Sequence, residues 1–157
     1  MLRTFRIPEE LIQASVKKME LEIKNVQPFP EALAFLQRLD ERGIPWRIVS
    51  NVSTPYCAPV TKALGIPDEK CFFSCREGFF KPAPQGLEMA AESMGLTPGD
   101  IMVIGTSKRL DVDAAMYARM SSFFLNRRQA DLWDALDSFD GKPMRNRMRP
   151  SESDLSR

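Results

Sequence analysis

Polar side chains follow three short apolar runs in this sequence. Ser50 and Asn51 come after an Ile-Val pair, Lys81 comes after two phenylalanines, and Asp111 lies six residues beyond Gly105. A hydroxyl, a lysine and an acid are the groups that a phosphate site needs, because phosphoryl transfer depends mainly on positioning and on neutralising the charge of the phosphate oxygens. The spacing therefore indicates phosphate chemistry.

Each of these segments also has an ordinary structural interpretation. Ser50 and Asn51 suit the cap of a following helix. Lys81 precedes a proline, which is common in the first turn of a helix, and Asp111 can stabilise a helix N-terminus through the helix dipole. Only their order and their place after successive apolar runs favour a shared site.

The composition excludes several classes of function. The chain has no histidine, so Ser-His and Cys-His triads are excluded and any chemistry must use carboxylate, lysine or hydroxyl groups. Lysine and arginine total 22 against 21 acids, and the net charge of +1 gives no general attraction for nucleic acid or for an anionic membrane. No apolar run approaches the length of a membrane span. We therefore predict neither a nucleic-acid nor a membrane partner.

The three cysteines, Cys57, Cys71 and Cys75, lack the spacing of a zinc site. We expect no signal peptide before them, and hence free thiols in a cytoplasmic protein. We also expect Cys71 and Cys75 to share one face of a strand.

The elements that must position the polar residues are helices alternating with short apolar strands. The expected helices are residues 9–24, 31–42, 56–64, 84–94, 111–120 and 132–136, and the expected strands are residues 45–49, 71–74, 101–104 and 122–125. This alternation is typical of an α/β domain with a parallel sheet covered on both faces. Ligands of such domains bind beyond the carboxyl ends of the strands, where Ser50, Thr106 and Asp111 lie.

Taken in order, the three polar segments resemble the second, third and fourth motifs of the haloacid dehalogenase (HAD) superfamily of phosphatases and related hydrolases. In that family a hydroxyl hydrogen-bonds the phosphoryl group, a lysine offsets charge on the nucleophile and the phosphate, and acids of the fourth motif hold Mg²⁺. The resemblance implies phosphate binding by Ser50, Asn51 and Lys81, a metal ligand at Asp111, and a small phosphorylated ligand.

The same resemblance implies a division of the chain. Residues 26–139 correspond to a Rossmann-like three-layer HAD core, and residues 1–25 to a remnant of the cap, the part that selects substrate in this family. Residues 140–157 form a polar tail, which has four basic residues and no acid between Lys142 and Arg149. A solvated, flexible tail is the simpler interpretation, and a handle for nucleic acid or an acidic partner is the alternative.

Two departures from the family pattern concern catalysis. The family's nucleophile lies in an Asp-x-Asp segment that should precede Pro28, yet residues 1–27 contain no aspartate. Thr106 stands where the fourth motif normally has an acid, and a neutral hydroxyl is a poor ligand for Mg²⁺. The resemblance thus implies Mg²⁺ for the family, while its binding by this chain is in doubt.

The missing segment is also the central strand of the family's sheet, between the strand that ends at Ser50 and the strand that ends at Gly105. Its loss leaves two strand edges with unpaired backbone groups, which are costly to bury. The two strands can pair directly, or a second copy or a partner chain can complete the sheet. The segment Leu2–Ile7 is a poor replacement, because Arg3 and Arg6 do not suit a strand that is buried on both faces.

Three functions stay open from the sequence. The first is a degenerate or truncated HAD-like hydrolase that is incompetent alone and keeps a residual anion site. The second is an active Mg²⁺-dependent phosphomonoesterase whose aspartate nucleophile comes from a missing segment or a partner chain. The third is a non-catalytic module that binds another protein.

Overall fold

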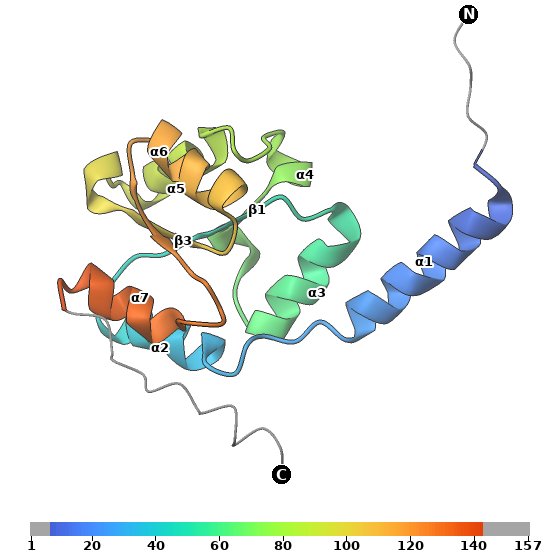
Figure 1. Cartoon of the computed structure of the whole chain (residues 1–157), viewed down its shortest axis with the longest axis horizontal. Helices are drawn as coiled ribbons and strands as arrows, with labels where there is room; N and C mark the ends of the chain where they lie inside the picture. The colour runs from blue at the N-terminus through green and yellow to red at the C-terminus, as the bar shows by residue number, and fades with distance from the viewer. Residues whose placement is uncertain (1–6, 143–157) are drawn as a thin grey trace, which may run out of the picture.

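The computed structural model describes residues 7–142, in which helices and short strands alternate along the chain (Figure 1). The helices are α1 (Glu9–Lys24), α2 (Ala32–Glu41), α3 (Thr54–Leu64), α4 (Ser74–Glu77), α5 (Gln85–Met94), α6 (Asp113–Tyr117) and α7 (Leu132–Phe139). The strands are β1 (Ile48–Ser50), β2 (Cys71–Phe73), β3 (Met102–Gly105) and β4 (Ser121–Phe124). This order confirms the predicted α/β fold class.

The strands form two separate parallel pairs. Strand β1 pairs with β2, and β3 pairs with β4. Within residues 7–142 no pairing joins β1 to β3. Direct pairing of these two strands, one of the alternatives raised by the sequence, is therefore wrong.

The two pairs nevertheless lie in one layer. Ile48 of β1 and Ile104 of β3 pack against a buried cluster from α2, α7 and Trp46. Val49 and Val103, the neighbouring residues, pack against a second cluster from α5 and α6. Because side chains alternate between the two faces of a strand, β1 and β3 have matching faces. The four strands are thus two halves of one interrupted sheet, with α5 and α6 on one side and α2 and α7 on the other (Figure 1).

The layer formed by α2 and α7 is held by apolar and ionic contacts. The rings of Phe35 and Trp133 meet edge to face, with centroids 5.8 Å apart. At the far ends of the two helices, the Arg42 guanidinium donates two hydrogen bonds to the Asp140 carboxylate, at 2.7 and 3.1 Å. Such bidentate pairs fix geometry as well as adding energy.

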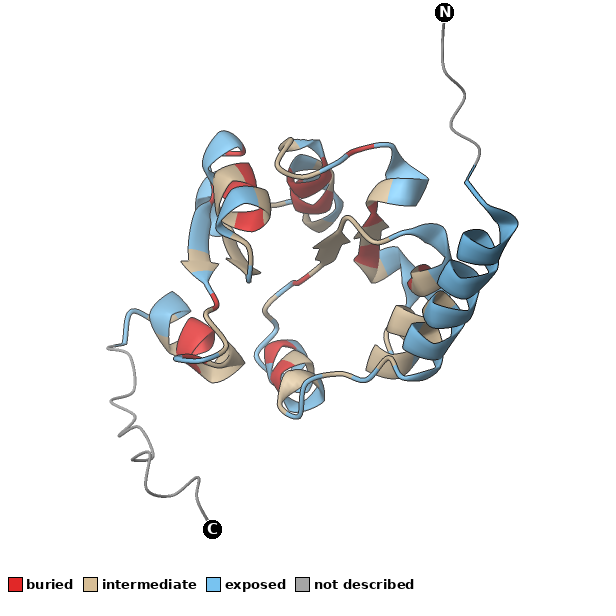
Figure 2. Ribbon diagram, turned by 45° about the vertical axis from the view of Figure 1, so that its right-hand side comes forward, coloured by how far each residue is buried: buried red, intermediate tan, exposed pale blue. Residues whose placement is uncertain are grey.

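Helix α1 extends away from the two layers, and none of its residues is buried (Figures 1 and 2). It lies beside α3, where the Tyr56 hydroxyl donates to a Glu22 carboxylate oxygen at 2.6 Å. The apolar residues Leu11 and Leu21 are each 59% exposed. The predicted helix is confirmed, but its apolar residues are only partly covered: Met19 and Ile23 are half-buried, whereas Leu11, Ile12 and Val16 are exposed.

One expectation about the cysteines is wrong. Cys71 is buried in β2, as predicted, but Cys75 lies on the short helix α4 and is exposed. The strand ends at Phe73, so the two cysteines do not share a strand face. Among the helices of residues 7–142, none is long and apolar enough to cross a membrane.

Candidate functional site

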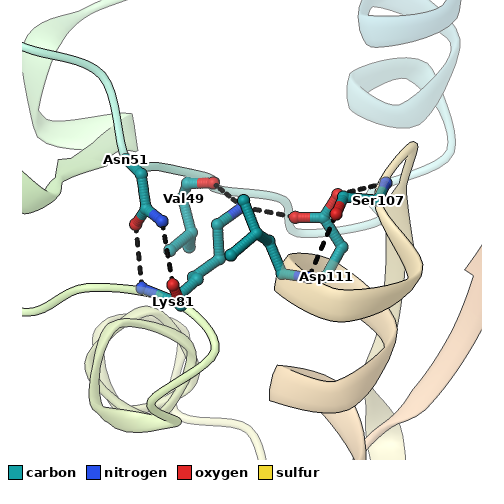
Figure 3. Close-up of polar contacts among 6 residues, drawn as sticks. Val49, Asn51, Lys81, Ser107 and Asp111 are labelled. Atoms are coloured by element: carbon teal, nitrogen blue, oxygen red, sulfur yellow. Dashed lines mark hydrogen bonds and ion pairs between the residues drawn. The ribbon is translucent and has the colours of Figure 1, made fainter.

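Lys81 lies between Val49 of β1 and Asp111, which follows β3 (Figure 3). It belongs to the loop between α4 and α5, and its Nζ donates to the Val49 carbonyl at 3.0 Å and to Asp111 Oδ1 at 2.6 Å. The side chains of Lys81 and Asp111 are each 13% exposed. The structure therefore brings together the lysine and the acid that the sequence singled out.

Asn51 holds the backbone of that lysine. Its Nδ2 donates to the Lys81 carbonyl at 3.0 Å, and its Oδ1 accepts from the Lys81 backbone N–H at 2.8 Å (Figure 3). Both polar atoms of the amide are used in this way. Asn51 is thus a positioning residue in the structure, a role that the sequence analysis missed, and its contact with phosphate stays a prediction.

Asp111 is held by the chain that leads into it. Its Oδ2 accepts from the Ser107 backbone N–H at 2.9 Å, and the Asp111 backbone N–H donates to the Ser107 carbonyl at 2.9 Å. Gly105 allows this approach, because a Cβ at that position would lie 2.2 Å from the Asp111 Cβ. The Ser107 hydroxyl accepts from the Leu110 backbone N–H at 3.1 Å and caps the helical turn that carries Asp111, a role that the sequence analysis missed.

Ser50 is the last residue of β1 and is half-buried beside Asn51. Its hydroxyl is not one of the groups that hold Lys81 and Asp111 together. A lysine ammonium has three donors, of which Lys81 uses two here. Contact of Ser50 and of the third Lys81 donor with an anion stays a prediction.

The residues present do not fit a Mg²⁺ ion. Both oxygens of Asp111 already accept hydrogen bonds, one from a cation. Thr106 is exposed and neutral, and residues 7–142 contain no group of three acids, cysteines or histidines that could hold a metal. A small divalent cation needs several carboxylate or water oxygens in octahedral geometry. The predicted ligand Asp111 is in place, but its surroundings favour the lysine over a metal.

A cavity of about 660 Å³ runs between β1 and β3 and reaches this site. Its walls are mainly apolar and include Ile48, Val103, Trp46, Leu87 and Leu136, while Lys81 and Asp111 line one end. No residue of β1 or β3 is fully buried, although both strands lie between helix layers. The cavity thus lies between β1 and β3, which are not paired with each other, and we call it the slot.

Comparison with known proteins agrees with this geometry. A family model described as haloacid dehalogenase-like hydrolase matches residues 5–119. Hexitol phosphatase A of Escherichia coli strain K12 is 32% identical over 84 residues, which are 53% of this chain and 39% of that protein. Phosphoglycolate phosphatase of the same strain is 35% identical over 95 residues, 57% of this chain and 36% of that protein. The chain thus spans less than half the length of these two relatives.

Solved structures show the same fold. A HAD family hydrolase from Deinococcus radiodurans R1, with bound phosphate and sodium, superposes with a TM-score of 0.65 at 21% identity, covering 75% of this chain and 53% of that one. A HAD phosphatase from Thermococcus onnurineus gives a TM-score of 0.63 at 19% identity, covering 79% and 63%. Since the family model covers most of the chain and the fold agrees with it, the chain belongs to the haloacid dehalogenase-like hydrolases.

Proposed function

We propose that this chain is a degenerate or truncated HAD-like hydrolase of the phosphatase type, which keeps a residual anion site and does not transfer phosphoryl groups unaided. The observation that carries the proposal is the Lys81–Asp111 ion pair at 2.6 Å. In the family, that lysine offsets the charge of a nucleophile and a phosphate. In this chain the lysine is neutralised by Asp111, and residues 1–27 contain no aspartate that would serve as the nucleophile.

Asp111 itself does not suit the role of nucleophile. A carboxylate that attacks phosphorus must have an oxygen lone pair directed at the substrate. Asp111 Oδ1 accepts from Lys81 and Oδ2 accepts from the Ser107 backbone, and the side chain is 13% exposed. Freeing one oxygen would leave a buried charge without its partner, which costs several kcal/mol.

Of the three predicted phosphate-binding residues, Ser50 and the third donor of Lys81 would form the residual anion site, because both polar atoms of the Asn51 amide already hydrogen-bond the Lys81 backbone. A phosphate oxygen placed between them would gain one hydroxyl and one charge-assisted hydrogen bond. This supports weak binding of a small phosphorylated ligand. We also propose a cytoplasmic location, supported by the three free thiols of the chain.

Thermal unfolding in inorganic phosphate tests the anion site. We expect the melting temperature of the wild type to rise with phosphate concentration and to stay constant in matched chloride. Lys81→Arg keeps the positive charge and the pairing with Asp111, so it serves as a folded variant with altered geometry. Lys142→Met, which removes an exposed lysine paired with Asp140, is the control and should respond as the wild type does. A wild type that phosphate does not stabilise would contradict the residual site.

A second candidate function is an active phosphomonoesterase whose aspartate comes from another polypeptide segment. The slot between β1 and β3 is the specific observation that favours it, because the slot ends at Lys81. Turnover of a generic phosphomonoester by this chain alone, abolished by Lys81→Ala, would overturn the first proposal. Turnover only after another segment is added would support the second.

A further inference from the structure

We propose that Cys57 and Cys75 form a redox site, in which the two thiols close to a reversible disulfide by exchange with a low-molecular-weight disulfide. The proposal concerns thiol chemistry, and it does not depend on whether the site at Lys81 binds an anion. It rests on the contact between the two sulfurs, on the difference in their exposure, and on the segments that they join.

The two sulfurs are already in contact. Cys57 belongs to the first turn of α3 and Cys75 to the short helix α4, which lies beside it (Figure 1). Their Sγ atoms are 3.5 Å apart, close enough for one thiol to donate to the other. A disulfide bond is about 2.0 Å long, so the sulfurs must approach by about 1.5 Å. This is the scale of a side-chain rotation, which moves an Sγ atom without moving its helix.

The difference in exposure gives each thiol its own part in the reaction. Cys75 is exposed, whereas Cys57 is 1% exposed and belongs to a buried cluster with Cys71 and Phe73. Burial first, and then the hydrogen bond with Cys75, raise the pKa of Cys57. Because the thiolate is the attacking form and needs access to its target, Cys75 is the thiol that meets an external disulfide. Cys57 then reacts with Cys75, the sulfur that it already contacts.

The exchange takes place in two steps. The Cys75 thiolate attacks one sulfur of the external disulfide RSSR, so that a mixed disulfide Cys75–SR forms and RS⁻ leaves. The Cys57 thiolate then attacks the Cys75 sulfur, the second RS⁻ leaves, and the bond between Cys57 and Cys75 is complete. The two protons lost by the cysteines convert both RS⁻ to RSH, and the cysteine pair is oxidised by two electrons while RSSR is reduced by two. The same steps in reverse restore the thiols when RSH is in excess.

The third thiol, Cys71, takes no part in this exchange. It lies in β2, and burial raises its pKa to about 11. Within residues 7–142, Cys57 and Cys75 are the only thiols that hydrogen-bond each other. The structure thus favours one of the possible cysteine pairs, and Cys71 serves as an internal reference.

The bond would join two segments that leave the same half-sheet. Helix α3 follows β1 by way of Asn51, and the chain beyond α4 leads to Lys81. Asn51 already hydrogen-bonds the Lys81 backbone at 3.0 and 2.8 Å, so these segments are held together in the thiol form. Cys57 and Cys75 are 18 positions apart in the sequence. A bond that closes such a loop restricts the unfolded chain and therefore stabilises the oxidised form.

Oxidation of the purified chain by glutathione tests the proposal directly. The protein is equilibrated with mixtures of oxidised and reduced glutathione, quenched in acid, alkylated after unfolding and digested. We expect mass spectrometry to find a peptide cross-linked between Cys57 and Cys75, which dithiothreitol removes, and to find Cys71 alkylated throughout. We also expect the internal disulfide to exceed the mixed disulfide of Cys75 with glutathione by at least about tenfold, because Cys57 is held against Cys75.

A matched set of variants separates the two steps. In Cys57→Ala the second step is impossible, so the mixed disulfide of Cys75 with glutathione should accumulate. In Cys75→Ser neither product should form, because Cys57 is not accessible to glutathione. Cys71→Ala is the control and should form the internal disulfide as the wild type does. Far-ultraviolet circular dichroism checks that the variants are folded, and the peptide map of the wild type does not depend on any of them.

Thermal unfolding gives an independent measurement. We expect the oxidised wild type to melt at least about 3 °C above the reduced wild type, and Cys75→Ser to melt at the same temperature in both buffers. An oxidised form that melts at or below the reduced form would overturn the proposal, because the bond would not fit the fold. Three results of the peptide map would also overturn it: no cross-link at any glutathione ratio, a cross-link to Cys71 in the folded protein, or disulfides only between two chains on a non-reducing gel.

Discussion

The Lys81 ammonium lies 2.6 Å from the Asp111 carboxylate and joins the two halves of an interrupted sheet. Lys81 also contacts the Val49 carbonyl at the end of β1, and Asp111 follows β3, so the pair lies across the end of the slot. The two residues that the sequence singled out for phosphate and for metal binding are therefore partners of each other in this structure.

Breaking that pair should destabilise the protein strongly. Lys81→Met leaves the Asp111 charge with only its backbone partner, and we expect the free energy of unfolding to fall by about 3 kcal/mol. The double variant Lys81→Met with Asp111→Asn should lose clearly less than the sum of the two single variants. Urea unfolding measures these values. The control is Arg38→Met, which removes an exposed ion pair with Glu41 and should change the free energy of unfolding by less than about 0.5 kcal/mol. If Arg38→Met lost as much stability as Lys81→Met, the buried pair would have no special role in stability.

Gly105 should tolerate no side chain. In Gly105→Ala the new Cβ would lie 2.2 Å from the Asp111 Cβ and 2.5 Å from its Oδ2. Relieving that overlap moves Asp111 away from Lys81, and we expect a loss of about 1–3 kcal/mol. Gly99→Ala is the control, because its Cβ would meet nothing nearer than the Thr97 hydroxyl at 3.9 Å. Equal melting temperatures for the two variants would show that the close approach of Gly105 to Asp111 does not affect stability.

The three thiols should react in a defined order. Cys75 is exposed, whereas burial raises the pKa of Cys71 to about 11 and also raises the pKa of Cys57. Since the thiolate is the reactive form, iodoacetamide at pH 8 should modify Cys75 first. Peptide mapping by mass spectrometry reads the order, and all three should react at similar rates in urea. Modification of Cys71 before Cys75 in the folded protein would contradict this prediction.

The contact between α2 and α7 should weaken in acid. Hydrogen bonds from Arg42, and next from Lys142, lower the pKa of Asp140 from its usual 3.8 to about 2. A carboxyl whose pKa is lower in the folded state stabilises the protein above the unfolded pKa, and this contribution is lost as the pH falls toward the folded pKa. Asp140→Asn should therefore be less stable than wild type at pH 7, with the difference shrinking between about pH 4 and pH 2. A difference for Asp140→Asn that is constant with pH would exclude this cause.

Restoring an acid at Thr106 should restore a response to Mg²⁺. Thr106→Asp places a second carboxylate beside Asp111 at the end of β3, and hard divalent cations prefer such oxygen sets. We expect Mg²⁺ to raise the melting temperature of Thr106→Asp and to leave the wild type and Thr106→Asn unchanged. If Mg²⁺ stabilised the wild type as much as the variant, Asp111 would be sufficient to bind Mg²⁺ without an acid at position 106.

Much of the fold could be predicted from local signals. Gly43, Gly65 and Gly95 end helices in the left-handed conformation that favours glycine, and the sequence predicted helix ends beside all three. The approach of Lys81 to Asp111 was also predictable in outline, because the carboxyl ends of parallel strands meet at one edge of a sheet.

Other features depend on contacts that no local pattern encodes. Asn51 binds the backbone of Lys81, thirty residues away, and a sequence pattern does not separate that use of an amide from phosphate binding. Cys75 does not share a strand face with Cys71, because β2 ends at Phe73 and a helical turn begins at Ser74. The open slot is a third case, since pairing of β1 with β3 would have closed the space that the two helix layers hold open.

Hydrolysis of p-nitrophenyl phosphate by the purified chain, with Mg²⁺ and without any added peptide, tests the central claim most directly. The account predicts release of nitrophenol at the rate of the buffer alone, equal for the wild type and for Lys81→Ala. Turnover by the wild type that Lys81→Ala abolishes would contradict it, because the lysine would then be serving a nucleophile that the chain itself provides.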